Sequence, residues 1–413
     1  MEIKNIFIGK IKKYYYMYNK QNFIILFIPE NIYSILESSI DFNSLQFDMD
    51  SVYDKLKGYD KMSQEYLMKF INEIKYNFFS EISQNANEKN LRSVDFMITN
   101  RCNLNCIHCS SRCKNNNVQM LSNKEIYRII DKLAVLKLDR IVFTGGEPLL
   151  VDEIEKILAY ARCKLEGTKI ILSTNGTLID KYVDCIVANI DVISISLDGY
   201  NDEITEQLRG RGVFKKVLDG IKLLQNKGFY NIKTSMVILN NNEKEMRKFI
   251  ELNDKLKTDY IFRMLCNVGR AKDNKGYFRE KNFSGYPVAN FLLTSGINNK
   301  KYLNARACSA YEDKIYINHD GKIYPCPSLK MREFQVDNIL DTNFTVDRLL
   351  IEMNNMKTKF LNLNTFFEDS KCEACSNKVF CWTCPADFII AKQNDDINAL
   401  CNIMKNKIEK LFI

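Results

Sequence analysis

The chain has 413 residues, 59 lysines and arginines against 51 aspartates and glutamates, and a formal net charge of +8. Its 46% of hydrophobic residues can bury cores for two or three domains, which excludes a disordered, collagen-like or small disulfide-stapled protein. There is no membrane-spanning apolar run, no secretory signal and no basic stripe, so we expect a cytoplasmic protein that binds neither membrane nor nucleic acid. In that compartment, its 14 cysteines are expected to be metal ligands and not disulfides.

The first 90 residues contain no cysteine and are predicted to form a small α+β module. Two runs of aromatic and β-branched residues, 14–18 and 23–28, flank the polar stretch Asn19-Lys20-Gln21-Asn22. This pattern predicts a β-hairpin. The sequence that follows predicts three helices, at about 30–39, 49–58 and 62–83, the last with apolar residues spaced four apart.

From residue 93 the chain alternates between strands and helices. The predicted strands are Val94–Thr99, Arg140–Thr144, Lys169–Thr174, Val192–Leu197, Lys233–Leu239 and Tyr260–Leu265. The predicted helices lie near 122–136, 151–163, 179–188, 213–227 and 242–256. This alternation indicates parallel βα units, and six of them predict an α/β fold, a partial (β/α)6 barrel open on one side. In such barrels the loops at the C-terminal ends of the strands form the active site.

The rest of the chain divides into a linker and a cysteine-rich region. Residues 276–300 are polar and irregular and are predicted to be a linker. Residues 301–413 hold seven of the 14 cysteines, with short strands, loops and a terminal helix from about residue 386. The sequence therefore predicts four parts: a module at 1–90, a barrel at 91–275, the linker, and the cysteine-rich region.

Three cysteines follow the first barrel strand with the spacing C-x3-C-x2-C, namely Cys102, Cys106 and Cys109. Thiolates so placed on one loop can hold three irons of a cubane cluster and leave the fourth iron open to a substrate. A zinc knuckle with His108 as the fourth ligand is the alternative, but this spacing does not match the usual zinc patterns.

This segment resembles the signature of the radical SAM superfamily, and the resemblance covers roughly residues 93–275. It implies that Cys102, Cys106 and Cys109 are the catalytic and metal-binding residues, holding a 4Fe–4S cluster whose open iron chelates S-adenosylmethionine (SAM). One electron from the cluster then cleaves SAM to methionine and a 5′-deoxyadenosyl radical.

The second strand ends in Thr144-Gly145-Gly146-Glu147-Pro148, which is similar to the GGEP motif of that superfamily. Two glycines let the backbone approach a ligand closely. The resemblance implies that the carbonyls of Gly145 and Gly146, together with Glu147, receive the ammonium group of SAM. Alone, this motif is an ordinary strand-to-helix turn, but here it follows the cysteine triad.

Small polar side chains lie at the ends of the third and fourth strands: Ser173, Asn175 and Ser196. Such groups suit hydrogen bonds to a ribose or a carboxylate. By the resemblance, Asn175 and Ser196 contact SAM, and Arg209 pairs with the SAM carboxylate, as a bidentate guanidinium can. Each of these residues can also be a turn or a helix cap. Arg263 and Arg270, near the sixth strand end, can contact SAM, the substrate or only solvent.

A second set of cysteines follows: Cys308, Cys326, Cys372, Cys375, Cys381, Cys384 and Cys401. Two C-x2-C pairs only five residues apart are too close for most zinc ribbons. The set resembles the SPASM domain of many radical SAM enzymes, which carries two auxiliary 4Fe–4S clusters, although its last C-x2-C gap is two residues where that family commonly has three. The resemblance implies two ligand groups: Cys372, Cys375, Cys381 and Cys401, and Cys308, Cys326 and Cys384.

Seven thiolates are one short of the eight ligand positions of two cubanes. Either one iron is open to substrate, or another residue completes the shell, with Cys266 the first candidate. Cys113, just past the triad, faces the active site or is a small buried side chain. Cys163 and Cys185 lie in helical stretches and are expected in the core.

A radical SAM core with a SPASM-like domain and a preceding module resembles peptide maturases, above all the clostridial maturases of cysteine-rich peptides. This implies a precursor peptide with a leader as partner, an electron donor such as flavodoxin or ferredoxin, and a winged-helix-like leader-binding domain at 1–90. Such domains add the peptide as a strand to a sheet edge. Five lysines favour an acidic leader: Lys4, Lys10, Lys12, Lys13 and Lys20. A module that only braces the barrel is the alternative.

The expected reaction begins with hydrogen abstraction from a Cα or Cβ of a peptide residue. A cysteine thiolate of the same peptide then traps that carbon as a thioether, and the extra electron leaves through the clusters. Oxidation to formylglycine, a carbon–carbon cross-link or epimerisation stay open on the same scaffold. A non-catalytic electron-transfer or peptide-binding protein is the alternative of another class, and the intact cysteine triad argues against it.

Overall fold

The computed structural model describes most of the chain. The described residues are 6–19, 24–41, 46–73, 91–113, 121–238, 243–265, 268–280, 302–304, 311, 313–363, 372, 375, 377–381, 384–393 and 397–411. No helix among them is long and apolar enough to cross a membrane. Cys266 and Cys308, both candidate cluster ligands, lie outside the described residues.

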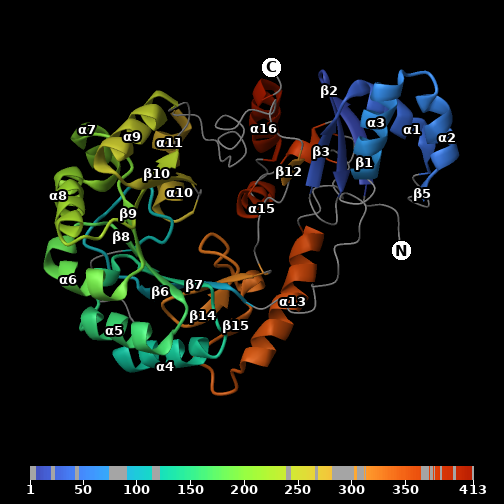
Figure 1. Ribbon diagram of the computed structural model, residues 1–413. Helices are drawn as coiled ribbons and strands as arrows, with labels where there is room; N and C mark the ends of the chain where they lie inside the picture. The colour runs from blue at the N-terminus through green and yellow to red at the C-terminus, as the bar shows by residue number, and fades with distance from the viewer. Residues whose placement is uncertain are drawn as a thin grey trace.

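Six parallel strands form the sheet of the α/β part of the molecule (Figure 1). They are β6 (Ser93–Thr99), β7 (Arg140–Gly145), β8 (Lys169–Thr174), β9 (Val192–Ser196), β10 (Ile232–Ile238) and β11 (Asp259–Met264). Each strand pairs in parallel with the next, and among the described strands β11 pairs only with β10, so the sheet does not close. The predicted strands and the partial barrel are confirmed.

Helices connect these strands and lie on the outer side of the sheet (Figure 1). They are η3 (Pro148–Leu150), α4 (Asn123–Ala134), α5 (Ile154–Lys164), α6 (Ile179–Asn189), α7 (Asp202–Arg209), α8 (Val213–Asn226) and α9 (Glu243–Leu256). Ser122 and Glu125 start α4 with a reciprocal capping box. The short and largely polar α7 was not predicted; it begins where the Asn201 side chain accepts from the Ile204 amide.

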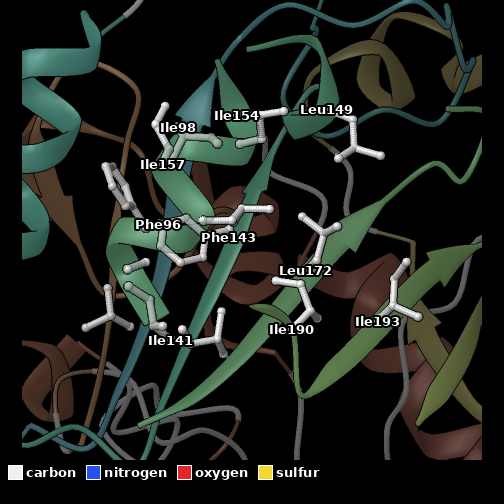
Figure 2. Packing of buried hydrophobic residues seen from close by; sticks show 14 of the residues in the cluster. Phe96, Ile98, Ile141, Phe143, Leu149, Ile154, Ile157, Leu172, Ile190 and Ile193 are labelled. Carbon is white, nitrogen blue, oxygen red and sulfur yellow. The ribbon is translucent and has the colours of Figure 1, made fainter. Parts of the chain in front are cut away.

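The core lies between the sheet and these helices (Figure 2). In β7, Ile141 and Phe143 are fully buried under the helices, whereas Val142 and Thr144 point to the other face and line a cavity. Alternate residues of a strand face opposite sides of a sheet, so one strand serves both the core and the cavity. Phe143 packs against Phe96 of β6, with ring centroids 6.1 Å apart.

Part of the cysteine-rich region extends the barrel sheet. β13 (Lys314–Ile317) pairs in parallel with β6, and β14 (Lys322–Tyr324) and β15 (Asp337–Asn338) continue the sheet antiparallel. The helices that follow are η5 (Arg332–Phe334), α13 (Val346–Leu363), η6 (Lys378–Phe380), α15 (Pro385–Gln393) and α16 (Ile397–Leu411). The 18-residue α13 was not predicted, and the single expected terminal helix is wrong because two helices, α15 and α16, form.

The N-terminal module is an antiparallel sheet with helices against it. Its elements are β1 (Ile6–Ile11), β2 (Tyr14–Asn19), β3 (Ile24–Ile28), α1 (Glu30–Ser39), β4 (Ile40–Asp41), β5 (Gln46–Phe47), α2 (Met49–Leu56) and α3 (Lys61–Glu73). The predicted hairpin and the first two helices are confirmed, and residues 74–83 of the third lie outside the described residues. β1 was not predicted, because Gly9 and Lys10, residue types that are depleted in strands, interrupt its apolar run.

The fourth strand of this sheet comes from a part of the sequence that follows the barrel. β12 (Tyr302–Asn304) pairs antiparallel with β3, which gives the order β1-β2-β3-β12. The expected linker at 276–300 is partly wrong, because α10 (Arg270–Asp273) is followed by α11 (Lys275–Glu280). Residues 281–301 of that linker lie outside the described residues.

Candidate active site

A cavity of about 760 Å³ lies on the inner face of the barrel. Residues from all six parallel strands line it, and Tyr316, Pro327 and Ser328 of the C-terminal region close one side. Nine of the predicted site residues line this cavity: Cys102, Cys106, Cys109, Gly145, Gly146, Ser173, Asn175, Ser196 and Arg209. Glu147 is not among the lining residues.

Residues 100–113, here called the cysteine loop, follow β6 and carry the predicted cluster ligands. Cys102 and Cys106 are buried, with 7% and 9% of their surface exposed, and Cys109 is half-buried. Burial raises the pKa of Cys102 to about 11. Hydrogen bonding by the Cys113 side chain lowers the pKa of Cys109 to about 5. The three thiols of the loop therefore lie at one end of the cavity in different environments, which shift the pKa values of Cys102 and Cys109 in opposite directions.

Arg270 holds the cysteine loop through its backbone. Its Nε donates to the carbonyl of Cys106 at 2.8 Å, its Nη1 to the carbonyl of Cys113 at 2.6 Å, and its backbone amide to the carbonyl of Cys109 at 2.8 Å. The preceding Gly269 has φ +62°, and a Cβ there would clash with the Cys109 and Ser110 carbonyls. A guanidinium so engaged braces the loop, which is a structural role that the sequence did not predict.

Gly146 lets the loop after β7 pack directly on the cysteine loop. A Cβ at this position would clash with the carbonyl oxygen of Arg101 and lie 2.8 Å from Cβ of Cys102. The backbone amides of Gly146 and Glu147 donate to the carbonyls of Thr99 and Arg101 at 2.9 and 2.8 Å. The sequence predicted that the backbone at Gly146 approaches a ligand closely. In the structure, it approaches the backbone of the cysteine loop at Arg101 and Cys102.

Glu147 connects the ends of β7 and β8. Its Oε1 accepts from the Thr174 hydroxyl at 2.8 Å and from the Leu149 amide at 3.0 Å, and its Oε2 accepts from the Asn175 amide at 2.8 Å. Full burial raises its pKa to about 7. Both oxygens therefore accept hydrogen bonds from the protein, and the assignment of Glu147 to the ammonium group of SAM stays a prediction.

Asn175 lies between the cysteine loop and the end of β8. Its Nδ2 donates to Oδ1 of Asn103 at 2.8 Å and lies 3.9 Å from Sγ of Cys102. Its Oδ1 accepts from the amide and hydroxyl of Thr177, at 2.9 and 2.7 Å. Asn175 therefore orients Cys102 as well as lining the cavity.

A buried ionic group joins the cysteine loop to β9. Oδ2 of Asp198 lies 2.5 Å from Nη2 of Arg209 and 3.0 Å from Nε2 of His108, and its Oδ1 accepts from the Val237 amide at 2.6 Å. Burial opposes ionisation of Asp198, but Arg209 and His108 outweigh it and lower its pKa. Nη1 of Arg209 in turn lies 4.0 Å from Sγ of Cys106. No sequence motif predicted that Asp198 pairs with either residue.

The thiols of the cysteine loop suit a cubane better than a single ion. A zinc ion needs ligands that converge within about 2.0–2.3 Å of one point. Among the described residues, no three His, Cys, Asp or Glu side chains converge in that way. A cubane instead bonds each thiolate to a different iron. His108, the fourth ligand of the zinc alternative, directs its Nε2 to Asp198.

The inner faces of the strands add further polar groups to the cavity, beyond the predicted site residues. Ser194, Ser235 and Thr144 line the cavity with their hydroxyl-bearing side chains, and Nη2 of Arg263 donates to Oγ of Ser194 at 3.3 Å. The alternation of small polar and apolar residues in β9 and β10 was the available signal. Deeper in the barrel the lining is cationic, with Arg140, Lys169, Lys233 and Lys314 near the N-terminal strand ends.

The described auxiliary cysteines fall into two neighbourhoods. Burial raises the pKa of Cys381 to about 12, and the nearby Cys401, Cys372 and Cys375 add to this. Cys326 and Cys384 pack against a different apolar cluster, around Tyr311 and Phe334. The two ligand groups implied by the resemblance stay a prediction, and Cys308 of the second group lies outside the described residues.

The cysteines expected in the core are not all there. Cys163 in α5 is exposed, so its assignment to the core is wrong. Cys185 in α6 is half-buried against the main core. Cys113 is 1% exposed and lines the cavity next to Cys109.

Comparison with protein families matches residues 96–252, from β6 into α9, to the Radical SAM superfamily. The mycofactocin maturase MftC of Mycolicibacterium smegmatis is 28% identical over 260 residues, which are 59% of this chain and 66% of that protein. A GTP 3′,8-cyclase of Alkaliphilus oremlandii is 27% identical over 261 residues, 57% of this chain and 81% of the cyclase.

Among solved structures, Streptococcus suis SuiB bound to S-adenosylmethionine covers 94% of this chain and 96% of its own, with a TM-score of 0.55 and 15% identity. SuiB bound to the precursor peptide SuiA covers the same shares, with a TM-score of 0.54. At this identity the likeness shows the fold. This chain spans between 52% and 81% of the length of the curated relatives that it matches.

The chain therefore carries a radical SAM domain, and the prediction of an enzyme of that superfamily is confirmed. The superfamily uses SAM and a 4Fe–4S cluster, which are the predicted cofactors. The cysteine loop and most of the residues that line the cavity lie inside the matched residues.

Proposed function

We propose that this protein is a radical SAM peptide maturase, which installs a thioether cross-link in a ribosomally made precursor peptide. The observation that carries the proposal is the gathering of Cys102, Cys106 and Cys109 at one end of a cavity that Arg209 also lines. When bound there, the 4Fe–4S cluster and SAM supply the radical that starts the reaction. Likeness to the mycofactocin maturase and to SuiB with its precursor peptide supports a peptide substrate.

Arg209 is assigned to the carboxylate of SAM. Its Nη2 is held by Asp198 and its Nη1 faces Cys106, but within the described residues its buried Nε has no acceptor. A buried N–H without an acceptor is costly, and a carboxylate in the cavity would satisfy it. Ser173 and Ser196 are assigned to the polar groups of SAM, and Gly145 and Gly146 to its ammonium group through their backbone.

Two auxiliary 4Fe–4S clusters complete the proposal. Cys372, Cys375, Cys381 and Cys401 would hold one, and Cys308, Cys326 and Cys384 the other. The neighbourhood of Cys381 supports the first group, and the shared packing of Cys326 and Cys384 supports the second. Pro327 and Ser328, next to Cys326, line the cavity, so the second cluster would border the substrate. A flavodoxin or ferredoxin would supply electrons.

The leader peptide is assigned to the N-terminal sheet at 1–90. β12 covers the β3 edge, and among the described strands β1 pairs only with β2, which leaves β1 as the edge for an added strand. The turn between β1 and β2 carries Lys12 and Lys13 beside Lys10, which favours an acidic leader.

The deciding experiment is anaerobic turnover with SAM, dithionite and a cysteine-containing precursor peptide encoded beside the gene. Formation of 5′-deoxyadenosine together with a peptide that has lost two hydrogens and one titratable thiol supports the proposal. A product with formylglycine in place of cysteine, or an unchanged mass with an inverted centre, would contradict it. No 5′-deoxyadenosine with intact clusters would exclude radical chemistry altogether.

Leader capture is tested by Lys12→Glu with Lys13→Glu, against Lys61→Glu on α3 as the matched control. The double variant should raise KM for the peptide, with kcat and uncoupled SAM cleavage unchanged, because leader binding and cleavage are separate. An unchanged KM would contradict leader binding by the N-terminal module and favour a purely structural role for it.

A further inference from the structure

Positive charge is unbalanced on the inner face of the barrel. Five strands each place one cationic side chain in the cavity lining: Arg140, Lys169, Lys233, Arg263 and Lys314. Among the described lining residues Asp95 is the one carboxylate, and it lies 2.6 Å from Nζ of Lys314. Asp259, outside the lining, lies 3.5 Å from Nζ of Lys233. In the described part of the chain, the other three cations therefore have no carboxylate as an ion-pair partner.

Two of these cations meet at one serine. Nη2 of Arg263, in β11, donates to Oγ of Ser194, in β9, at 3.3 Å. Lys233 lies on β10, the strand between these two, and is the register partner of Ser194. All three side chains line the cavity. Arg263, Lys233 and Ser194, here called the cationic cluster, therefore bring two positive charges and a hydroxyl to one place.

The cationic cluster lies deeper in the barrel than the residues assigned to SAM. Ser194 precedes Ser196 by two residues on β9, and both line the cavity. Two residues of a strand span about 6.5 Å, so Ser194 lies that much farther from the C-terminal strand ends. The carboxylate of SAM is assigned to Arg209. The cationic cluster is therefore left for a different ligand.

The donors of the cationic cluster suit a carboxylate. A guanidinium carries five N–H groups in a planar fork that matches two carboxylate oxygens. Ser194 accepts from Nη2 of Arg263, and its own hydroxyl hydrogen is still able to be donated. Lys233 adds charge, and a cleft lined by one sign of charge concentrates ions of the opposite sign. A peptide offers a carboxylate in the side chains of Asp and Glu and at its C-terminus.

We propose that the cationic cluster binds a carboxylate of the substrate peptide, close to the residue that is modified, with Arg263 in direct contact. The inference rests on the proposed function and adds a substrate requirement to it. Because an extended peptide spans about 3.3–3.6 Å per residue, a depth of about 6.5 Å places the carboxylate within about two positions of the modified residue.

The test is a double-mutant cycle with full-length, anaerobically reconstituted protein and the precursor peptide encoded beside the gene. One arm is Arg263→Gln. The other arm replaces a peptide carboxylate by an amide, either at Asp or Glu within two positions of the modified residue or at the C-terminus. With wild-type enzyme, one amide peptide should lower kcat/KM for modification about tenfold, as expected for the loss of a charge-assisted hydrogen bond.

Arg263→Gln should lower kcat/KM for the native peptide equally, with no further loss for that amide peptide, because the pair is already broken. Arg263→Lys keeps the charge without the planar fork and should lie between wild type and Arg263→Gln. Arg247→Gln, at an exposed position of α9, is the matched control and should equal the wild type. The peptide arm uses the wild-type enzyme, so it stays decisive even where Arg263→Gln does not fold.

The amide peptide that loses activity identifies the carboxylate as a side chain or as the C-terminus. Equal kcat/KM for all peptides with the wild type overturns this inference and leaves the proposed function intact. Losses that multiply when both arms are combined also overturn it, because Arg263 and the carboxylate then act independently. A wild type that consumes GTP together with SAM and leaves the peptide unchanged overturns both, since the cations would then serve a triphosphate.

Discussion

At the scale of single residues, the candidate site depends on backbone contacts that bring the cysteine loop against its neighbours. Gly146 and Gly269 each occupy a place where a side chain would meet a carbonyl oxygen of that loop. Arg270 and Asn274 then bind its carbonyls directly. The loop is thus held by packing and by hydrogen bonds before any cofactor binds.

Gly146→Ala is expected to disrupt the loop. The added methyl group would overlap the Arg101 carbonyl and press on Cβ of Cys102, and backbone atoms cannot give way cheaply. Overpacking of this kind costs about 1–3 kcal/mol of stability. Iron analysis after reconstitution should show the loss of about one cubane, or four irons. Gly276→Ala in α11, where a Cβ meets nothing within 4 Å, is the control and should keep full iron. Equal iron in the two variants would contradict this reading.

Arg270→Gln should weaken the loop by removing two charge-assisted hydrogen bonds to carbonyls. Each such bond contributes about 1.5–3 kcal/mol, and the carbonyls of Cys106 and Cys113 would lose their partner. We expect a lower melting temperature and faster loss of the SAM-binding cluster to a chelator. Arg112→Gln is the matched control, since Arg112 lies on the same loop and, among the described residues, pairs only with the exposed Asp273. Chelation at the same rate in both variants would argue against a bracing role.

Sequence was a good guide to which residues gather at the cavity and a poor one to their individual contacts. The three cysteines, Asn175 and Arg209 were found because short motifs at parallel strand ends must meet at one edge. The burial of Glu147 and the pairing of Asp198 with Arg209 and His108 could not be found. They depend on contacts between side chains of different elements and on the packing of β9 against the loop.

At the scale of secondary-structure elements, strong periodicity was reliable and short or irregular segments were not. The six barrel strands and five of their helices agree with prediction because alternating and helical patterns repeat over many residues. The eight-residue α7 and the linker helices α10 and α11 were missed because short polar segments carry little pattern. The 18-residue α13 was also not predicted.

The separation of the cysteine loop from the C-terminal cysteines predicts independent cluster sites. The triple variant Cys102→Ala, Cys106→Ala and Cys109→Ala should fall from about twelve irons to about eight, because two cubanes stay bound elsewhere. It should make no 5′-deoxyadenosine. Protein-bound iron and zinc measured by mass spectrometry check the first claim, and chromatography of the SAM products checks the second. Stoichiometric zinc with about four irons in the wild type would contradict the auxiliary clusters.

At the scale of the whole molecule, the sheet of the N-terminal module contacts the cysteine-rich region. Phe380, in η6 between Cys375 and Cys381, lies edge-on to Tyr16 at 4.9 Å and parallel to Phe27 at 6.2 Å between ring centroids. The N-terminal module therefore packs on the segment that carries one proposed group of auxiliary cluster ligands. A leader peptide bound to this module would lie near that cluster.

Phe380→Ala is expected to weaken the contact between the N-terminal module and the cysteine-rich region. Removing a fully buried ring costs about 3–5 kcal/mol of stability, and the cavity would open beside Cys381. Auxiliary iron should fall while the SAM-sensitive cluster signal stays. Phe380→Leu, which keeps most of the volume, should lie between the two. Equal auxiliary iron in Phe380→Ala and the wild type would show that the cluster loop does not depend on the module.

The strand β12 has a consequence for how the protein is made. Its partner β3 ends at Ile28, and β12 begins at Tyr302, so 273 residues (29–301) lie between them. A ribosome adding about 5–20 residues per second needs roughly 14–55 seconds to cross that distance. During that time the edge of the apolar strand Ile24–Ile28 that later pairs with β12 is unpaired on the nascent chain. Such an edge invites pairing with other chains, so synthesis of this protein should depend on chaperones that shield the N-terminal sheet until the barrel has been translated.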